Sequence, residues 1–266
     1  MRKLIIPILI LVLVPASLAT AQRENPGSKS ELAEITERGR RLAAYDVAAW
    51  HATDEVRALK PVEGSVARYI AKQTNDKWVV VFGRLNEKRD RFLIAYEATQ
   101  AASPVEFKVK KHEPPQEDEG FYLAAAKAID TALADFSGAQ RPYNVAVLPA
   151  SSGQMHVYVV PAQTQNGIYP LGGDVRYLIS PDGSKIVERR QLHKTILEIK
   201  TTENTEGGFH TAILDDIPED TDVFHVLTRK PSMREWIGTQ KYIYIVEPDG
   251  SIIYLMTAEA FKKIGK

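Results

Sequence analysis

The stretch SELAEITERGRRLAAYDVAAWHATDEVRALKP, residues 30–61, decides the fold class because it carries the spacing of a long helix. Its apolar side chains recur mostly three, four and seven residues apart, which places them on one helical face. Ser28, three residues before Glu31, suits an N-terminal capping box, and Lys60-Pro61 ends the segment because the residue before proline avoids helical geometry. We therefore expect a long N-terminal helix. Its apolar face consists of Leu32, Ile35, Leu42, Tyr45, Ala49 and Trp50.

A β region follows this helix. Residues 78–82 and 92–96 are apolar runs separated by the polar loop 86–90, and residues 105–109 alternate between apolar and charged side chains. Such patterns are typical of strands, and the alternation indicates that one side of the last strand faces solvent. Because the connections are short, we expect an antiparallel β meander.

The segment EPPQEDE, residues 113–119, is acidic and contains prolines, so we interpret it as a solvated linker. A second amphipathic helix is expected after the linker, with Gly138 placed to cap its C-terminal end. The apolar face of this helix consists of Tyr122, Ala125, Ala126, Ile129, Leu133 and Phe136.

The chain after residue 140 is mostly strand-like. The tetrapeptide Pro-Asp-Gly-Ser occurs at residues 181–184 and again at 248–251, each time between apolar runs, and Asp-Gly in this setting indicates a hairpin turn. The predicted fold class is α+β. Residues 30–140 supply the long helix, the meander and the second helix, and residues 141–266 supply a β-rich C-terminal half. Whether these regions are one domain or two is left open.

The N-terminus has the features of a secretion signal. A short basic start precedes the apolar run 4–15, and Ala19 and Ala21 are the small residues that signal peptidase accepts. We predict that residues 1–21 are a cleaved signal peptide and that 22–29 are a flexible leader. The mature chain is then exported, to the periplasm or the cell exterior, without a transmembrane segment. An uncleaved anchor is the alternative, although the run is short for ~30 Å of hydrocarbon.

Charge and cysteine content exclude several classes of protein. The mature chain carries 32 basic and 34 acidic residues, because the signal peptide holds two of the 34 basic residues and no acidic one. A near-neutral balance argues against a nucleic-acid partner, and the sequence indicates no other partner. The absence of cysteine excludes a disulfide framework, thiol catalysis, iron–sulfur clusters and thiolate zinc sites.

Familiar catalytic motifs are absent from the chain. It contains no G-x-S-x-G, S-x-x-K, G-x-G-x-x-G, Walker or H-E-x-x-H sequence. His51, Asp54 and Glu55 share a face of the expected N-terminal helix. They could hold a divalent ion, or they could form only a local ion pair on a solvated face.

The richest group of candidate metal ligands lies in GGFHTAILDDIPEDTDVFHVLTRK, residues 207–230. If residues 222–227 are helical, Asp222 and His225 share a face, whereas in a strand they point to opposite sides. The run is rich in β-branched and aromatic residues, so we predict a strand and do not expect a complete metal site. The nitrogen and oxygen donors available for zinc are His210, Asp215, Asp216, Asp222 and His225.

The order of residues around His210 resembles the JAMM-type zinc metallopeptidases. Their signature is His-x-His followed by Ser-x-x-Asp, with a catalytic glutamate on an earlier strand. Residues 208–211 resemble the approach to the first histidine, Asp222 matches the aspartate, and residues 167–173 resemble the glycine-spaced hairpin after the glutamate. The resemblance covers residues 160–255 and implies a zinc-binding hydrolase core with His210 and Asp222 as ligands.

Three positions depart from that signature. Ala212 occupies the place of the second histidine, Glu219 that of the serine, and Gln163 and Gln165 lie where the glutamate is expected. We therefore predict a binding or structural accessory role without catalysis and without a cofactor, and a zinc Kd no tighter than micromolar. The alternative is a JAMM-like metal-dependent hydrolase with an altered ligand set, in which zinc is held by His210, Asp222 and His225.

Overall fold

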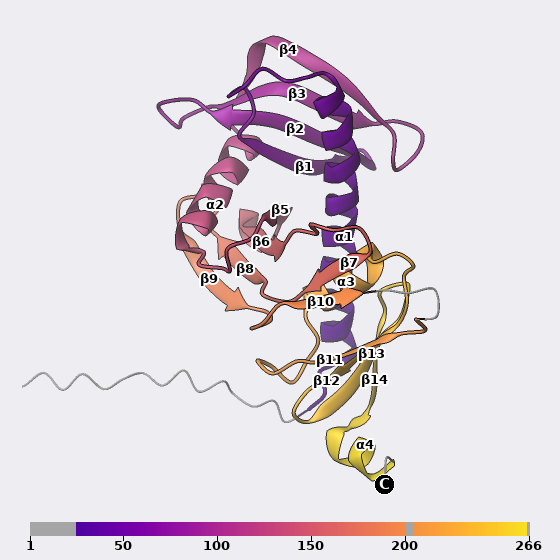
Figure 1. Cartoon of the computed structure of the whole chain (residues 1–266). Coiled ribbons are helices and arrows are strands. Elements are labelled where there is room, and N and C mark those ends of the chain that lie inside the picture. The colour runs from indigo at the N-terminus through magenta and orange to yellow at the C-terminus, as the bar shows by residue number, and fades with distance from the viewer. Residues whose placement is uncertain (1–24, 201–204, 265–266) are drawn as a thin grey trace, which may run out of the picture.

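The computed structural model describes residues 25–200 and 205–264, so the predicted signal peptide at 1–21 lies outside the described residues. The described chain is α+β, as predicted, with one long helix crossing most of the molecule (Figure 1). No helix among the described residues is long and apolar enough to cross a lipid bilayer. The helices are α1 (Lys29–Ala58), α2 (Phe121–Asp135), α3 (Asp220–Thr228) and α4 (Ala258–Ile264), with a 3-10 turn η1 (Ser151–Gly153).

Helix α1 begins and ends where the sequence indicates. The Ser28 hydroxyl accepts the backbone N–H of Glu31 at 3.1 Å, and the helix stops at Ala58, ahead of Pro61. Most of its apolar face is shared between two cores: residues near its C-terminal half pack on the meander, and Leu32 and Ile35 pack beside α3. Trp50 was expected on this face, but it is exposed and belongs to neither core. The helix thereby ties the two ends of the molecule together.

The first sheet is an antiparallel meander, as expected, but it has four strands in the order β1-β2-β3-β4, and β1 was not predicted from the sequence. Residues 113–119 are mostly solvent-exposed, as predicted, but residues 113–118 belong to the long fourth strand, so the interpretation of this segment as a linker was wrong. Prolines are tolerated there because β4 is an edge strand and its pairing with β3 shifts between Ile94 and Tyr96, opposite the prolines. The strands are β1 (Arg68–Thr74), β2 (Lys77–Leu85), β3 (Phe92–Gln100) and β4 (Phe107–Asp118).

A second antiparallel sheet has the order β5-β6-β8-β9. Helix α2 packs between this sheet and the meander through an alanine-rich face that includes Ala125 and Ile129. The helix ends at Asp135, so the expectation that it extends to a Gly138 cap was wrong; Phe136 is already extended, and its ring packs on Tyr143. The strands are β5 (Tyr143–Pro149), β6 (Met155–Pro161), β8 (Val175–Ile179) and β9 (Ile186–Gln191), and beside them β7 (Ile168–Leu171) pairs with β10 (Leu197–Lys200).

The third sheet has the order β11-β12-β13-β14, with β11 and β12 parallel and the other pairs antiparallel. One face packs against α3 and the start of α1. Both Pro-Asp-Gly-Ser segments form the predicted hairpin turns, one between β8 and β9 and one between β13 and β14. The strands are β11 (Gly208–Thr211), β12 (Glu235–Gly238), β13 (Tyr242–Val246) and β14 (Ile252–Thr257).

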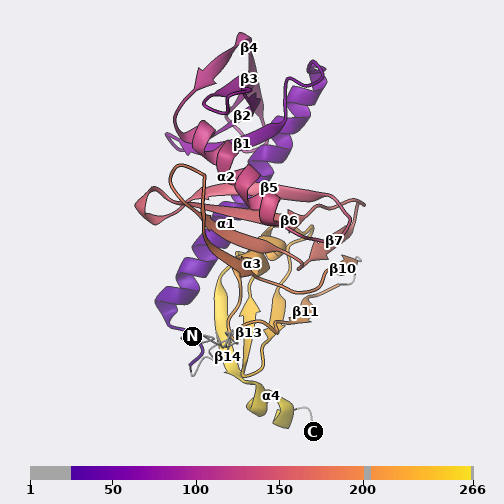
Figure 2. The same ribbon diagram turned by 90° about the vertical axis from the view of Figure 1, so that its left-hand side faces the viewer.

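The prediction of a strand at residues 222–227 was wrong, because this segment belongs to α3. The helix start overrides the β propensity of the run: the Asp222 carboxylate accepts the backbone N–H of Glu219 at 2.7 Å, and Asp220 and Asp222 lie in the first turn, where the helix dipole favours acids. Helix α3 lies between the second and third sheets in both views (Figures 1 and 2). Its N-terminal turn is fully buried there.

Candidate metal centre

Three side chains from three separate elements converge beside the start of α3. His193 follows β9, His210 lies on β11, and Asp222 lies on α3. The Nε2 atoms of both histidines lie 3.0 Å from Asp222 Oδ1, and the ligand atoms of the three residues all lie within 4.8 Å of one another. The two imidazole rings meet edge to face at 5.7 Å.

Each histidine is oriented by a second carboxylate. His193 Nδ1 lies 2.9 Å from Asp174 Oδ1, and His210 Nδ1 lies 3.1 Å from Glu235 Oε1. A carboxylate on Nδ1 fixes the ring orientation and directs Nε2 inward, as it does for histidines that ligate metals. Glu235 is itself held by Arg229 Nη1 at 3.0 Å. Both Nε2 atoms are thereby aimed at Asp222.

Two glycines make room for these carboxylate–imidazole pairs. A Cβ at Gly208 would overlap the Glu235 carboxylate, so only glycine lets that carboxylate reach His210. Gly172 has a φ of +86°, and a Cβ there would overlap the carbonyl of Thr195, so the segment that carries His193 could not pass. Gly172, in the segment 167–173, thus helps to position His193, and Gly208 helps to position the Glu235 carboxylate on His210.

The ligand atoms are buried and incompletely satisfied. The side chains of His193, His210 and Asp222 are 8%, 2% and 0% exposed. Within the described part of the chain, the two Nε2 atoms and Asp222 Oδ1 have no hydrogen bond of acceptable geometry, although they lie at ion-pair distance from one another. Buried polar atoms are normally hydrogen-bonded, so these three atoms require an explanation. Either two imidazolium groups facing the Asp222 carboxylate or a bound cation would supply one.

The pKa values indicate how the three ligand side chains are protonated in the absence of a metal. Burial by itself would lower the pKa of His210, but the Asp222 carboxylate raises it to about 9. Burial would likewise lower the pKa of His193, which Asp174 and Asp222 raise well above its usual value. Burial opposes ionisation of Asp222, yet both histidines hold its pKa far below the usual range. The metal-free cluster therefore carries two imidazolium groups.

A divalent ion would substitute for those protons without changing the charge of the cluster. Without a metal, the net charge of the cluster is −1, from two imidazolium groups and the three carboxylates of Asp174, Asp222 and Glu235. With one divalent cation and two neutral imidazoles, the net charge is again −1. Two imidazole nitrogens and one carboxylate oxygen are donors that zinc accepts, and they also suit iron(II).

The structure brings together two of the three residues proposed from the sequence as metal ligands. His210 and Asp222 meet, whereas His225 lies outside the cluster, with its Nε2 3.4 Å from Arg229 Nη1. Burial, together with Arg229, lowers the pKa of His225 to about 4, so this ring is neutral. The third ligand is instead His193. No local motif marked it, because it is a lone histidine far from the other ligands in sequence.

The other candidate donors are engaged elsewhere. Asp215 pairs with Arg190 at 2.9 Å, and Asp216 Oδ1 accepts the backbone N–H of Lys241 at 3.2 Å. On α1, the His51 ring stacks on Trp50 with centroids 4.8 Å apart, and His51 belongs to no metal-ligand group found in the described chain.

Comparisons with known proteins add no further constraint. No family model matches the chain, and neither the curated proteins nor the solved structures give a match. The resemblance to JAMM-type metallopeptidases thus stays a prediction from the sequence. The chemistry of this protein follows from its own donor set: a buried His-His-Asp cluster with two carboxylates behind it.

Proposed function

We propose that this is an exported metal-binding accessory protein in which His193, His210 and Asp222 hold one divalent transition-metal ion, with zinc the first candidate. The observation that carries the proposal is the convergence of three buried ligand atoms that lack hydrogen bonds of acceptable geometry. Carboxylates behind both imidazoles strengthen it, because such partners orient ligands and make them more basic.

The ion's first role in this proposal is structural. His193 extends from the second sheet, His210 belongs to the third, and Asp222 comes from the helix between them. No strand of one sheet pairs with a strand of the other among the described residues. A metal joining them therefore converts its binding free energy into folding free energy.

Metal-dependent hydrolysis is the second candidate, and two observations favour it. The cluster offers three protein ligands, the number typical of catalytic zinc, which keeps its fourth position for water. Glu219 is buried at the start of α3, where its carboxylate pairs with Arg190 at 2.6 Å, and burial raises its pKa to about 7 although Arg190 favours its charged form. A carboxyl group with such a pKa exchanges protons near neutral pH, as a general base requires.

Metal content tests the proposal directly. The mature chain is purified without chelator, dialysed against metal-free buffer and measured by plasma emission. We expect close to one equivalent of zinc in the wild type, loss of the metal in His193→Ala, and retention in His225→Gln, a matched buried histidine outside the cluster. Zinc-free wild type after reconstitution, or zinc retained in full by His193→Ala, would refute the assignment.

The hydrolase candidate needs its own readout. Zinc-loaded wild type and Glu219→Gln are compared on peptide and ester substrates, with metal content measured on the same samples. Turnover that disappears in Glu219→Gln while zinc remains bound supports the second candidate. If the zinc-loaded wild type shows no turnover, the hydrolase candidate is excluded for these substrates and only the structural role of the ion is retained.

A further inference from the structure

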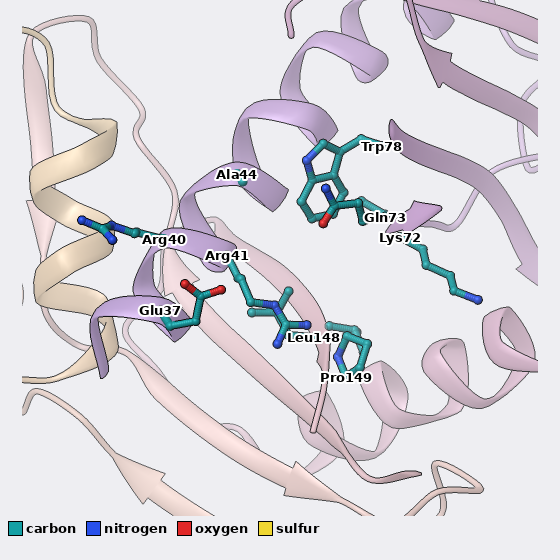
Figure 3. A pocket seen from close by; sticks show the side chains of 11 residues that line it. Glu37, Arg40, Arg41, Ala44, Lys72, Gln73, Trp78, Leu148 and Pro149 are labelled. Atoms are coloured by element: carbon teal, nitrogen blue, oxygen red, sulfur yellow. The ribbon is translucent and has the colours of Figure 1, made fainter. Parts of the chain in front are cut away.

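A pocket of about 580 Å³ lies between α1, the β1–β2 hairpin and the end of β5, and shares no residue with the metal cluster (Figure 3). Its volume falls within the roughly 300–1,000 Å³ typical of small-molecule sites. Its floor is apolar and includes Ala44, Leu148 and Pro149.

The walls of this pocket are held in place by packing. Strands β1 and β5 are edge strands of their sheets, and the Tyr45 hydroxyl accepts the backbone N–H of Ala71 at 3.2 Å between them. The Trp78 ring meets Tyr45 edge to face at 6.0 Å, and Gln73 pairs with Trp78 across the hairpin. The indole and the amide therefore form a preformed wall above the helix.

The pocket is lined by one anion, Glu37, and three cations, Arg40, Arg41 and Lys72. Glu37 and Arg41 are one turn apart on α1, and both face the pocket (Figure 3). In the described chain, neither side chain has an ion-pair partner within 4.0 Å. The other two cations of the lining contact groups outside the pocket: Arg40 donates to the Asp249 carbonyl at 2.8 Å, and Lys72 lies over the Phe121 ring at 4.8 Å.

We propose that this pocket binds a small zwitterion with an apolar or aromatic side chain, namely a free amino acid or a short peptide with free termini. The ligand carboxylate pairs with the Arg41 guanidinium, which suits bidentate recognition. The ligand ammonium pairs with the Glu37 carboxylate. The apolar side chain lies against Trp78 and Leu148, where burial of apolar surface supplies most of the attraction.

Titration of the mature, zinc-loaded chain with the dipeptide Phe-Phe tests the proposal, with calorimetry and tryptophan fluorescence as readouts. We expect saturable binding that weakens about tenfold or more in Arg41→Gln, because a charge-assisted bidentate contact is lost. Arg57→Gln, which removes an exposed arginine near the far end of α1, serves as the control and binds as the wild type does. Trp78→Phe loses the fluorescence change.

Modified ligands separate the two charges. The N-acetyl dipeptide lacks the ammonium group and should bind wild type and Glu37→Gln equally, whereas Phe-Phe should bind Glu37→Gln more weakly than wild type. The dipeptide amide lacks the carboxylate and should be insensitive to Arg41→Gln. Absence of saturable binding at millimolar Phe-Phe, or equal affinity in wild type and Arg41→Gln, would overturn the proposal. Circular dichroism establishes that each variant is folded.

Discussion

The substitution His193→Ala isolates the contribution of the proposed metal to stability. A ligand that binds only the folded state at about one hundred times its Kd adds ~2.7 kcal/mol to the free energy of unfolding. In a domain of about this size, each kcal/mol moves the Tm by roughly 2–4 °C, so zinc should raise the wild-type Tm by roughly 5–11 °C. The sequence indicated only two ligands of this cluster, His210 and Asp222, and therefore predicted weak zinc binding. With His193 as a third ligand, we expect a Kd for zinc tighter than micromolar.

Loss of His193 should abolish that shift. The side chain is 8% exposed, and no other histidine joins the group of ligand atoms among the described residues, so nothing nearby replaces it. The assay is thermal unfolding by circular dichroism of wild type and variant, each with excess zinc and with chelator, at one protein concentration. Each protein is compared with itself, because the variant also loses its ion pairs with Asp174 and Asp222.

The control for this experiment is His225→Gln, on α3 but outside the cluster. It should keep the zinc-dependent rise even if its metal-free Tm is lower. The reasoning fails if zinc raises the Tm of His193→Ala as much as that of wild type. It also fails if zinc leaves the wild-type Tm unchanged.

Four further predictions concern the cluster, the packing of α1 and the N-terminus. Glu235→Gln weakens the carboxylate behind His210 and should lower zinc affinity about 10–100-fold in chelator competition. In metal-free protein, the raised pKa of His210, about 9, stabilises the fold below pH 6.5, so urea titrations should show this contribution disappearing as pH rises toward 9. Gly39→Ala places a Cβ against Val223 and should cost about 1–3 kcal/mol in urea unfolding, whereas an unchanged midpoint would contradict the packing of α1 on α3. N-terminal sequencing of exported protein should begin at Gln22, and an intact Met1 would exclude cleavage.

Much of the fold was readable from the sequence because it is encoded locally. The cap at Ser28 and the proline at 61 bound α1, and the Pro-Asp-Gly-Ser turns dictate two hairpins whose flanking strands are contiguous. Local signals failed where tertiary context prevailed. The segment 113–118 became an edge strand because β3 offered it a partner, and the segment 222–227 became helical because capping and burial outweighed its β propensity.

The candidate site was only half readable for the same reason. His210 and Asp222 lie in one stretch, and the spacing that drew attention to them is local. The packing of the second and third sheets around α3 brings His193 to them, whereas Asp174 reaches His193 across the β8–β9 hairpin and Glu235 reaches His210 through the pairing of β11 with β12. Gly172 and Gly208 can be read from the sequence, but the need for glycine at these positions depends on contacts with Thr195 and Glu235 that only the structure shows.

The arrangement of ligands argues for an ion that joins parts of the molecule. Asp174 and His193 flank the β8–β9 hairpin of the second sheet, while His210 and Glu235 lie on adjacent strands of the third. Each imidazole–carboxylate pair therefore belongs to one sheet, and Asp222, on the helix between the sheets, is the ligand that faces both. Without a metal, ion pairs join the two sheets to Asp222 only while both imidazoles are protonated. A divalent ion would join them with both imidazoles neutral. Metal and protons compete for the same two Nε2 atoms, so metal binding should release protons and its affinity should rise with pH.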